Sequence, residues 1–239
     1  MTSANITFEN TPFSRLIKES EELAQIRKEY ASLSDKERMF AADYHYNASF
    51  ASQLFDAALG KTSDKSSPWP CEVESLAIDP NYAPAILTVG SYEYIYGRID
   101  EAMNLFLSLV TLPETTEDLV EIIDKAGDFL IDNKDYKNAK TLYLTAVRKH
   151  PNIPTYHSGL GYCLAKLGRL EEAVEQARCA VNLEPDNYLY LTDLGWSLVE
   201  AEHFDEAHTI LERAVSISPP DYELAKGNLK ELHHRLQQI

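Results

Sequence analysis

Carboxylates are the most numerous ionisable side chains in this sequence, and three of them fall at a regular helical spacing. Asp124, Asp128 and Asp132 lie four residues apart, so a helix through them would place all three on one face. Acid–base catalysis needs two carboxyl groups in clearly different environments, and no such pair can be singled out among the carboxylates. The spacing therefore indicates a charged helix face and predicts no catalytic pair.

The histidines do not form a recognisable metal site. Two ligands on one helix are expected three or four residues apart. His203 and His208 are five residues apart, and His233 and His234 are adjacent. We therefore interpret them as surface histidines and predict no metal site.

The cysteines and the glycines give no catalytic motif either. Cys71, Cys163 and Cys179 are odd in number and include no Cys-x-x-Cys, so we interpret them as reduced thiols of a cytoplasmic protein. The sequence also lacks a phosphate-binding glycine loop and a Gly-x-Ser-x-Gly elbow. We predict no catalytic residue, no cofactor and no enzyme activity.

The charge balance restricts the kinds of partner. With 22 Lys and Arg against 38 Asp and Glu, the formal net charge is -16, which repels nucleic acids and acidic membrane surfaces. The first twenty residues show no basic run followed by an apolar run, and no stretch approaches the roughly 18 to 20 apolar residues of a membrane span. We therefore expect a cytoplasmic protein that binds neither nucleic acid nor membrane.

A repeated helix pair is the element that must position the charged residues. Glycines in one column are 37, 34 and 34 residues apart, alanines in a second column repeat these spacings, and prolines follow at 34 and 34. The columns are Gly90, Gly127, Gly161 and Gly195; Ala102, Ala139, Ala173 and Ala207; and Pro151, Pro185 and Pro219. Small residues let two helices approach closely, and a proline ends the second helix. Such units bury their apolar faces only by stacking on one another.

The 34-residue period, with a small residue in the first helix and alanines in the second, resembles the tetratricopeptide repeat family. The resemblance is carried by "SGLGYCLAKLGRLEEAVEQARCAVNLEP" and "TDLGWSLVEAEHFDEAHTILERAVSISP" and covers residues 83–219. Glu93 and Leu109 depart from it, because the family usually has an aromatic residue and an alanine there. The resemblance implies an all-α protein, a right-handed α-solenoid of stacked helix-turn-helix repeats. The repeats are expected at about 83–116, 120–153, 154–187 and 188–220.

The flanks are expected to add helices at both ends of the stack. Residues 1–34 should form an N-terminal helix, and residues 35–82 a degenerate helix pair with an inserted loop, opened by a capping box from Ser34 to Glu37. Residues 221–239 should form a C-terminal capping helix with Asp221 as its N-cap. The apolar stripes of the terminal helices are expected at Leu16, Leu23, Ile26 and Tyr30, and at Leu224, Leu229, Leu232 and Leu236.

The resemblance places the first helix of each repeat on the concave side of the stack. Residues of these helices that point away from the glycine column should then line a groove rich in carboxylates and aromatic rings. The predicted peptide-binding residues are Tyr94, Glu121, Asp124, Asp128, Asp132, Tyr162, Asp193 and Trp196, and Thr192, Val199 and Glu200 lie on the same stripe. The stripe is either a solvated acidic face with packed aromatics or an electronegative trough with aromatic anchors.

The composition of this groove indicates the kind of partner. Family members that clamp the acidic C-terminus of heat-shock chaperones present Lys, Arg and Asn from their first helices, whereas this stripe is mostly Asp, Glu, Thr and aromatic. We therefore predict a non-enzymatic scaffold that binds a basic or amphipathic segment of a partner polypeptide. Tyr94, Tyr162 and Trp196 would be its anchors, and the aspartates would steer the partner.

Two other functions stay open at this point. Some acidic bacterial chaperones with these repeats hold hydrophobic segments of exported proteins, and the aromatic groove is compatible with that role. Alternatively, the chain is a structural subunit that assembles with itself or with a larger complex through its flanking helices. A homo-oligomer is compatible with the second of these hypotheses.

Overall fold

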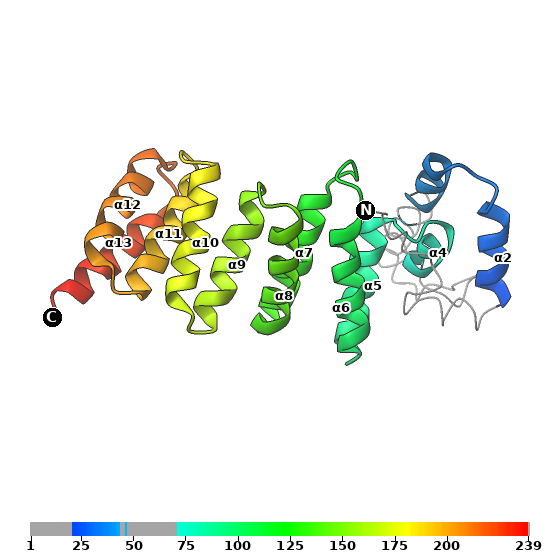
Figure 1. The fold of residues 1–239 in the computed structure, drawn as a ribbon, viewed down its shortest axis with the longest axis horizontal. Helices are drawn as coiled ribbons and strands as arrows, with labels where there is room; N and C mark the ends of the chain where they lie inside the picture. Colours follow the sequence, from blue (N-terminus) through cyan, green and yellow to red (C-terminus); the bar gives the residue numbers. More distant parts are fainter. Residues whose placement is uncertain (1–20, 44–45, 47–70, 239) are drawn as a thin grey trace, which may run out of the picture. The chain divides into compact units, whose positions relative to one another are not determined.

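The computed structural model describes residues 21–43, 46 and 71–238, and every regular element in these ranges is a helix (Figure 1). A helix covers residues 35–43. The helices that follow the N-terminal region alternate along the chain with short turns. The bounds are α2 (Glu21–Tyr30), α4 (Cys71–Ile78), α5 (Ala83–Ile95), α6 (Ile99–Thr111), α7 (Leu119–Asp132), α8 (Tyr136–Lys149), α9 (Pro154–Lys166), α10 (Leu170–Leu183), α11 (Tyr188–Glu200), α12 (Phe204–Ile217) and α13 (Glu223–Leu236).

The chain divides into two compact units, Met1–Ile123 and Asp124–Ile239, called unit 1 and unit 2 below. The division falls inside α7, within the second of the four predicted repeat ranges. Tyr94 and Glu121 therefore belong to unit 1, and the other six predicted binding residues belong to unit 2.

In unit 1, α5 packs against both α4 and α6. Gly90 of α5 faces the fully buried ring of Phe106, and a Cβ at Gly90 would lie 2.5 Å from Phe106 Cε1. The glycine column therefore allows close packing of the two helices, as predicted. Glu93, which stands where the family usually has an aromatic residue, is buried and forms an ion pair with Arg98.

The capping box at the start of residues 35–43 is confirmed. The backbone N–H of Ser34 donates to Glu37 Oε2 (2.9 Å), and the backbone N–H of Glu37 donates to Ser34 Oγ (3.4 Å). The hydroxyl of Ser34 also donates to Glu37 Oε2 (2.6 Å), and this bond, followed by the one from the Ser34 backbone, holds the pKa of the Glu37 carboxyl below its usual value. In α2, Ile26 and Tyr30 are half-buried, whereas Leu16 and the inserted loop lie outside the described residues.

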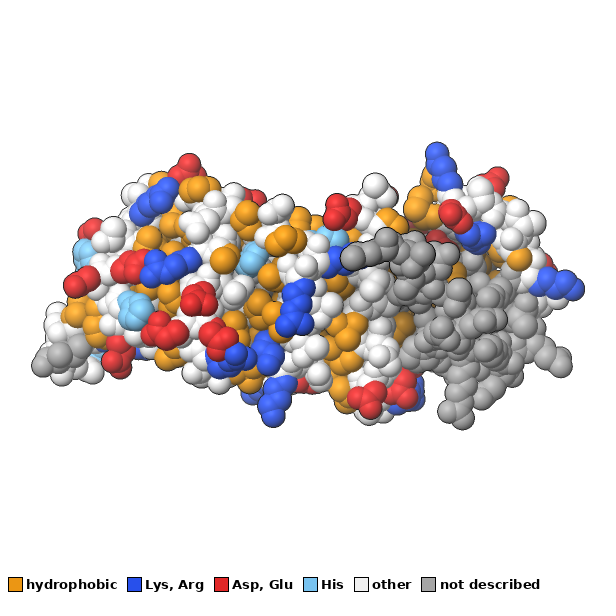
Figure 2. All heavy atoms as spheres, viewed as in Figure 1, with side chains coloured by type: hydrophobic (Ala, Val, Ile, Leu, Met, Phe, Trp, Pro, Cys, Tyr) orange, Lys and Arg blue, Asp and Glu red, His pale blue; other side chains and the backbone are white. Residues whose placement is uncertain are grey.

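In unit 2, each helix from α8 to α13 packs against the next one in the chain. Alternate helices touch as well, since α11 contacts both α9 and α13, so these three form one continuous layer. Pro151, Pro185 and Pro219 each stand two residues after the last residue of α8, α10 and α12. On the face shown in Figure 2, apolar side chains of this unit lie among acidic and basic ones.

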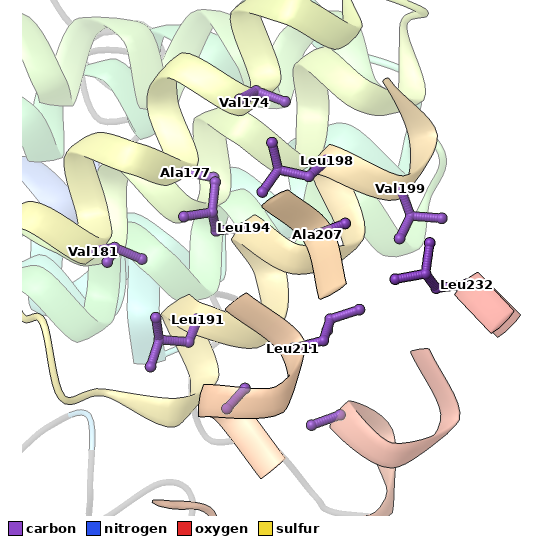
Figure 3. Close-up of a cluster of buried hydrophobic side chains, with 12 residues drawn as sticks. Val174, Ala177, Val181, Leu191, Leu194, Leu198, Val199, Ala207, Leu211 and Leu232 are labelled. Carbon is purple, nitrogen blue, oxygen red and sulfur yellow. The ribbon is translucent and has the colours of Figure 1, made fainter. Parts of the chain in front are cut away.

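The core of unit 2 is shared between neighbouring helix pairs (Figure 3). Leu191, Leu194 and Leu198 of α11 are its centre, with exposed fractions of 2 % or less. Side chains from α10, α12 and α13 surround them, among them Leu211 of α12. A Cβ at Gly195 would lie 2.5 Å from Leu211 Cδ2, so this glycine of the column also faces a bulky side chain. Because α10 and α13 cover apolar side chains of the α11–α12 pair, this pair does not bury its apolar face alone.

The structure corrects two details of the predicted capping helix. Asp221 is not its N-cap, because Tyr222 occupies the N-cap position and packs edge-on against Tyr188, with ring centroids 4.8 Å apart. Leu224 and Leu236 do not face the core, being 55 % and 43 % exposed. Ala225 and Leu232 fill that role instead, since they lie seven residues apart on the face that meets α11 and α12.

Candidate peptide-binding face

Six of the predicted binding residues come from α7, α9 and α11 of unit 2. We call them, together with Ser158, the first-helix face: Asp124, Asp128, Asp132, Ser158, Tyr162, Asp193 and Trp196. Hydrogen bonds tie α9 to α11 here. Ser158 Oγ donates to Asp193 Oδ2 (2.7 Å), and Thr155 Oγ1 lies 3.1 Å from the hydroxyl oxygen of Tyr190.

Asp193 is held by this bond rather than presented freely. Its side chain reaches solvent, but the surrounding protein displaces much of its hydration and raises the pKa of its carboxyl. The hydrogen bond from Ser158 opposes that shift, because it stabilises the ionised carboxylate. Asp193 therefore helps to join two helices of the face.

Asp124 is also engaged within the protein. The hydroxyl of Tyr143, a fully buried residue of α8, donates to Asp124 Oδ1 (2.8 Å). Burial raises the pKa of Asp124, the bond from Tyr143 lowers it, and the charge of Asp128 raises it further. Burial and the charge of Asp124 raise the pKa of the Tyr143 hydroxyl well above its usual value, so it stays a hydrogen-bond donor at neutral pH.

Asp128 and Asp132 differ from these two carboxylates. Both are exposed, and neither has a hydrogen bond or ion pair with any residue in the described ranges. Burial, followed by the charge of Asp132, raises the pKa of Asp128. Burial, followed by the charge of Asp128, raises the pKa of the Cys163 thiol of α9 to about 12. These two aspartates are the free negative charges of the face.

The aromatic residues of the face differ in how much surface they offer. Tyr162 is 47 % exposed, and the ammonium nitrogen of Lys166 lies 5.1 Å from the centre of its ring. Trp196 packs partly against the core of unit 2, and the guanidinium carbon of Arg235 lies 5.4 Å from the centre of its ring. Arg235 comes from α13, so the C-terminal helix covers part of Trp196.

The same arginine neutralises a further predicted groove residue. Arg235 Nη2 donates to Glu200 Oε1 (2.7 Å), and Arg235 Nε donates to Glu231 Oε1 (3.2 Å). Thr192 and Val199, which the helical spacing also places on the groove stripe, are buried, with exposed fractions of 1 % and 0 %. The prediction was wrong for these two because α11 is packed between α9 and α13, which cover both flanks of its stripe.

In unit 1, the two remaining predicted residues lie on different helices. Tyr94 is half-buried on α5, and Glu121 is exposed in the first turn of α7.

Comparison with known proteins identifies the repeat. The family model described as tetratricopeptide repeat matches residues 125–187, which span most of α7 and all of α8, α9 and α10. A small glutamine-rich tetratricopeptide repeat-containing protein of Mycosarcoma maydis is 27 % identical over 113 residues, covering 46 % of this chain and 32 % of the relative. Residues 125–187 of this chain are therefore tetratricopeptide repeats.

Two further relatives are matched over a small part of their length. The tetratricopeptide repeat-containing thioredoxin TTL4 of Arabidopsis thaliana is 30 % identical over 131 residues, covering 54 % of this chain and 19 % of the relative. Hsp70-Hsp90 organizing protein 2 of the same plant is 25 % identical over 104 residues, covering 44 % and 18 %. The chain therefore spans about a third or less of the length of these three relatives.

Solved structures confirm the fold class of the chain. YrrB, described as a repeat protein with an unusual peptide-binding site, superposes with a TM-score of 0.53 at 21 % identity, over 92 % of this chain and 98 % of its own. MamA of Desulfovibrio magneticus superposes with a TM-score of 0.51 at 17 % identity, over 78 % and 97 %. The predicted all-α solenoid of helix-turn-helix repeats is thus confirmed.

The helix-to-helix bonds of this repeat protein could have been found from the sequence. Ser158 and Asp193 are 35 residues apart, and so are Thr155 and Tyr190, which is one repeat length plus one residue. A search for polar pairs at that spacing would have shown that Asp193 has a partner. The bond between Tyr143 and Asp124 has no comparable signal, because it joins the two helices of one pair at a separation of 19 residues.

Among the residues that the structure describes, no group of three or more His, Cys, Asp or Glu side chains is arranged to hold a metal ion. None of the helices in the same ranges combines the length and the apolar character of a membrane span.

Proposed function

We propose that the chain is a non-enzymatic scaffold that holds a basic or amphipathic segment of a partner polypeptide on the first-helix face of unit 2. The observation that carries the proposal is the pair Asp128 and Asp132. Both carboxylates are exposed and unpaired within the described residues, and they stand four residues apart on α7. The exposed ring of Tyr162 is on α9 and precedes Cys163 in the chain, whose thiol pKa is raised by burial and then by the charge of Asp128.

The aspartate pair lowers the stability of the protein in the absence of a partner. Like charges four residues apart on a helix are unfavourable by about 0.2–0.5 kcal/mol. A lysine or arginine of a partner would relieve this repulsion, so the pair contributes more to the complex than to the free chain. Such exposed charges chiefly raise the association rate and select against acidic partners.

Aromatic contacts would supply most of the affinity. Tyrosine and tryptophan are frequent binding hot spots, because they bury a large surface with little loss of side-chain freedom. Tyr162 is the principal anchor, and Trp196 offers the part of its ring that Arg235 and the core leave uncovered. Tyr94 and Glu121 belong to unit 1, and their role in binding stays a prediction from the sequence.

The relatives support a protein as the partner, whereas the charge of the partner segment is inferred from the residues of this chain. One relative is named as an organizing protein of Hsp70 and Hsp90. An acidic tail is a poor match for the first-helix face, because Arg235 is engaged with Glu200 and Glu231, and Lys166 stands over Tyr162. A basic segment fits the unpaired aspartates better.

A redox or catalytic role has little support in the described residues. Cys163 is fully buried and the pKa of its thiol is raised to about 12, so hardly any reactive thiolate forms at neutral pH. The thioredoxin named among the relatives is matched over 19 % of its length. We further propose a cytoplasmic location, in which the thiols stay reduced.

A peptide array tests the proposal. Peptides that vary independently in net charge and aromatic content are probed with the labelled full-length protein and with the Tyr162→Ala variant. Basic and amphipathic peptides should be enriched over neutral ones of equal length, and the variant should lose most of that signal. Equal binding of neutral and basic peptides, or a variant that binds as well as the parent protein, would overturn the proposal.

A further inference from the structure

The outer surface of α8 is basic, in contrast to the protein as a whole. Helix α8 contains no Asp or Glu, and its first turn lacks the acidic residues present in the first turn of α6, α10 and α12. Its buried face consists of Ala139, Leu142, Tyr143 and Ala146. The opposite face, at helical offsets of 3 and 11 residues, carries Lys137, Lys140 and Arg148, which we call the α8 basic stripe.

The stripe is unpaired, whereas many cations elsewhere in unit 2 are paired. Lys137, Lys140 and Arg148 have no hydrogen bond or ion pair with any residue that the structure describes. The nearest carboxylate in the chain, Asp135, caps the helix by accepting from the backbone N–H of Asn138 (3.2 Å). Paired cations elsewhere in the unit are Arg169 with Glu172, Arg178 with Glu206, Arg213 with Asp186, Lys226 with Glu223 and Arg235 with Glu200.

Two of the three cations lie at positions where a positive charge does not stabilise the helix. Lys137 and Lys140 lie in the first turn and a half of α8, where the helix macrodipole favours negative charge. The stability of the helix therefore gives no reason for lysine at either position. In the corresponding turn of α10 the sequence has Glu171 and Glu172.

Figure 2 shows basic side chains gathered over the position of α8, with acidic side chains more frequent over α10 to α12. The basic surface is therefore short and adjoins acidic surface on the side of α10. From Lys137 to Arg148 the stripe extends over about 16 Å, at about 1.5 Å per helical residue. An extended chain of about five residues has the same length.

We propose that the α8 basic stripe is a second docking surface, which binds a short acidic segment of a partner polypeptide. Charge complementarity selects the occupant, because three unpaired cations without an intervening carboxylate attract Asp and Glu side chains. The length of the stripe selects a short segment. A nucleic-acid duplex or an anionic membrane would extend beyond it onto Glu171, Glu172 and Glu175 of α10 and be repelled. This surface lies on the outer side of α8, so it is separate from the first-helix face.

Fluorescence anisotropy with a labelled pentaglutamate peptide, flanked by Gly-Ser, tests the proposal on the full-length protein at low ionic strength. The peptide should bind, and a pentaglutamine peptide of the same design should not. The double variant Lys137→Gln with Lys140→Gln should bind on the order of tenfold more weakly, since each exposed ion pair contributes a few-fold. The matched variant Lys166→Gln with Lys230→Gln removes the same charge from α9 and α13 and should bind like the parent protein.

Three results would overturn the proposal. The first is equal binding of pentaglutamate and pentaglutamine, and the second is an equal loss of affinity in the two double variants. The third is stripe-dependent binding of duplex RNA or phosphatidylserine vesicles that exceeds the binding of pentaglutamate. Circular dichroism of both variants checks that the helices are intact, because Lys140 is half-buried whereas the other three lysines are exposed.

Discussion

Tyr143 is packed so closely that an added methyl group beside it should destabilise unit 2. Its ring approaches glycine on two different helices, Gly127 of α7 and Gly159 of α9. A Cβ at Gly159 would lie 2.5 Å from Tyr143 Cε1, and a Cβ at Gly127 would overlap the ring as well. The ring has no room to retreat, because its hydroxyl is bound to Asp124 and its side chain is fully buried. We therefore expect Gly159→Ala to be destabilising.

The magnitude follows from two opposing effects. Replacing glycine by alanine within a helix stabilises by about 1 kcal/mol through backbone entropy. Overpacking a core lowers the free energy of unfolding by about 1–3 kcal/mol. Because Gly127 and Asp124 confine the ring, we expect Gly159→Ala to fall at the upper end of this range. The net expectation is a loss of about 2 kcal/mol. With a urea dependence of about 2 kcal/mol per molar, the unfolding midpoint falls by about 1 M.

Gly227→Ala is the matched control. Gly227 also lies inside a helix, α13, but a Cβ there would meet nothing within 4 Å. The same substitution should therefore stabilise by about 0.5–1 kcal/mol. Urea unfolding followed by circular dichroism at the helical minimum compares both variants with the parent protein. A stabilising Gly159→Ala, or a destabilisation of equal size at both positions, would refute the packing argument.

Three further predictions concern charge and thiol chemistry in unit 2. Asp128→Asn should raise stability by about 0.2–0.5 kcal/mol at neutral pH. Burial and the charge of Asp132 raise the pKa of Asp128 in the folded protein above its value in the unfolded chain. Ionised Asp128 therefore lowers the free energy of unfolding at pH values above the folded-state pKa. This effect disappears as the pH falls to the unfolded-state pKa. Urea midpoints should therefore differ at neutral pH and converge at acidic pH; a gap that widens on acidification would contradict this. Arg235→Ala should speed amide exchange in α13 and leave α8 to α10 unchanged, because it removes the ion pair with Glu200; uniform acceleration would speak against a local role. In a variant that keeps Cys163 as its sole cysteine, this thiol should resist a thiol-specific disulfide reagent until urea unfolds the chain. The reason is that Cys163 is buried and its pKa is raised to about 12. Rapid labelling of the folded protein would disprove its burial.

The fold could be predicted from the sequence because its determinants recur at one period. Gly90, Gly195 and their column each mark a place where two helices approach closely, and the prolines mark where second helices end. Local signals of this kind survive in a single sequence. The capping box from Ser34 to Glu37 was predicted for the same reason, since its partners are three residues apart.

The state of each groove residue could not be predicted in the same way, because it depends on partners from other helices. Asp124, Asp128 and Asp193 have the same side chain and fall on the same predicted stripe. Tyr143 and Ser158 engage two of them and leave Asp128 free, which becomes visible only when α7 to α11 are assembled. The partial cover of a predicted anchor by the C-terminal helix has the same origin.

Charge reversal at the aspartate pair is the most direct test of the proposed binding role. Titration calorimetry measures a basic, tyrosine-containing peptide selected on the array against the parent protein and the variant Asp128→Lys with Asp132→Lys. The control, Glu175→Lys with Glu202→Lys, makes the same change in net charge at two other exposed positions of unit 2. We predict that reversal at the aspartate pair abolishes binding and that the control retains most of it. Equal loss in both variants, or full binding after reversal of Asp128 and Asp132, would contradict the assignment of partner binding to the first-helix face.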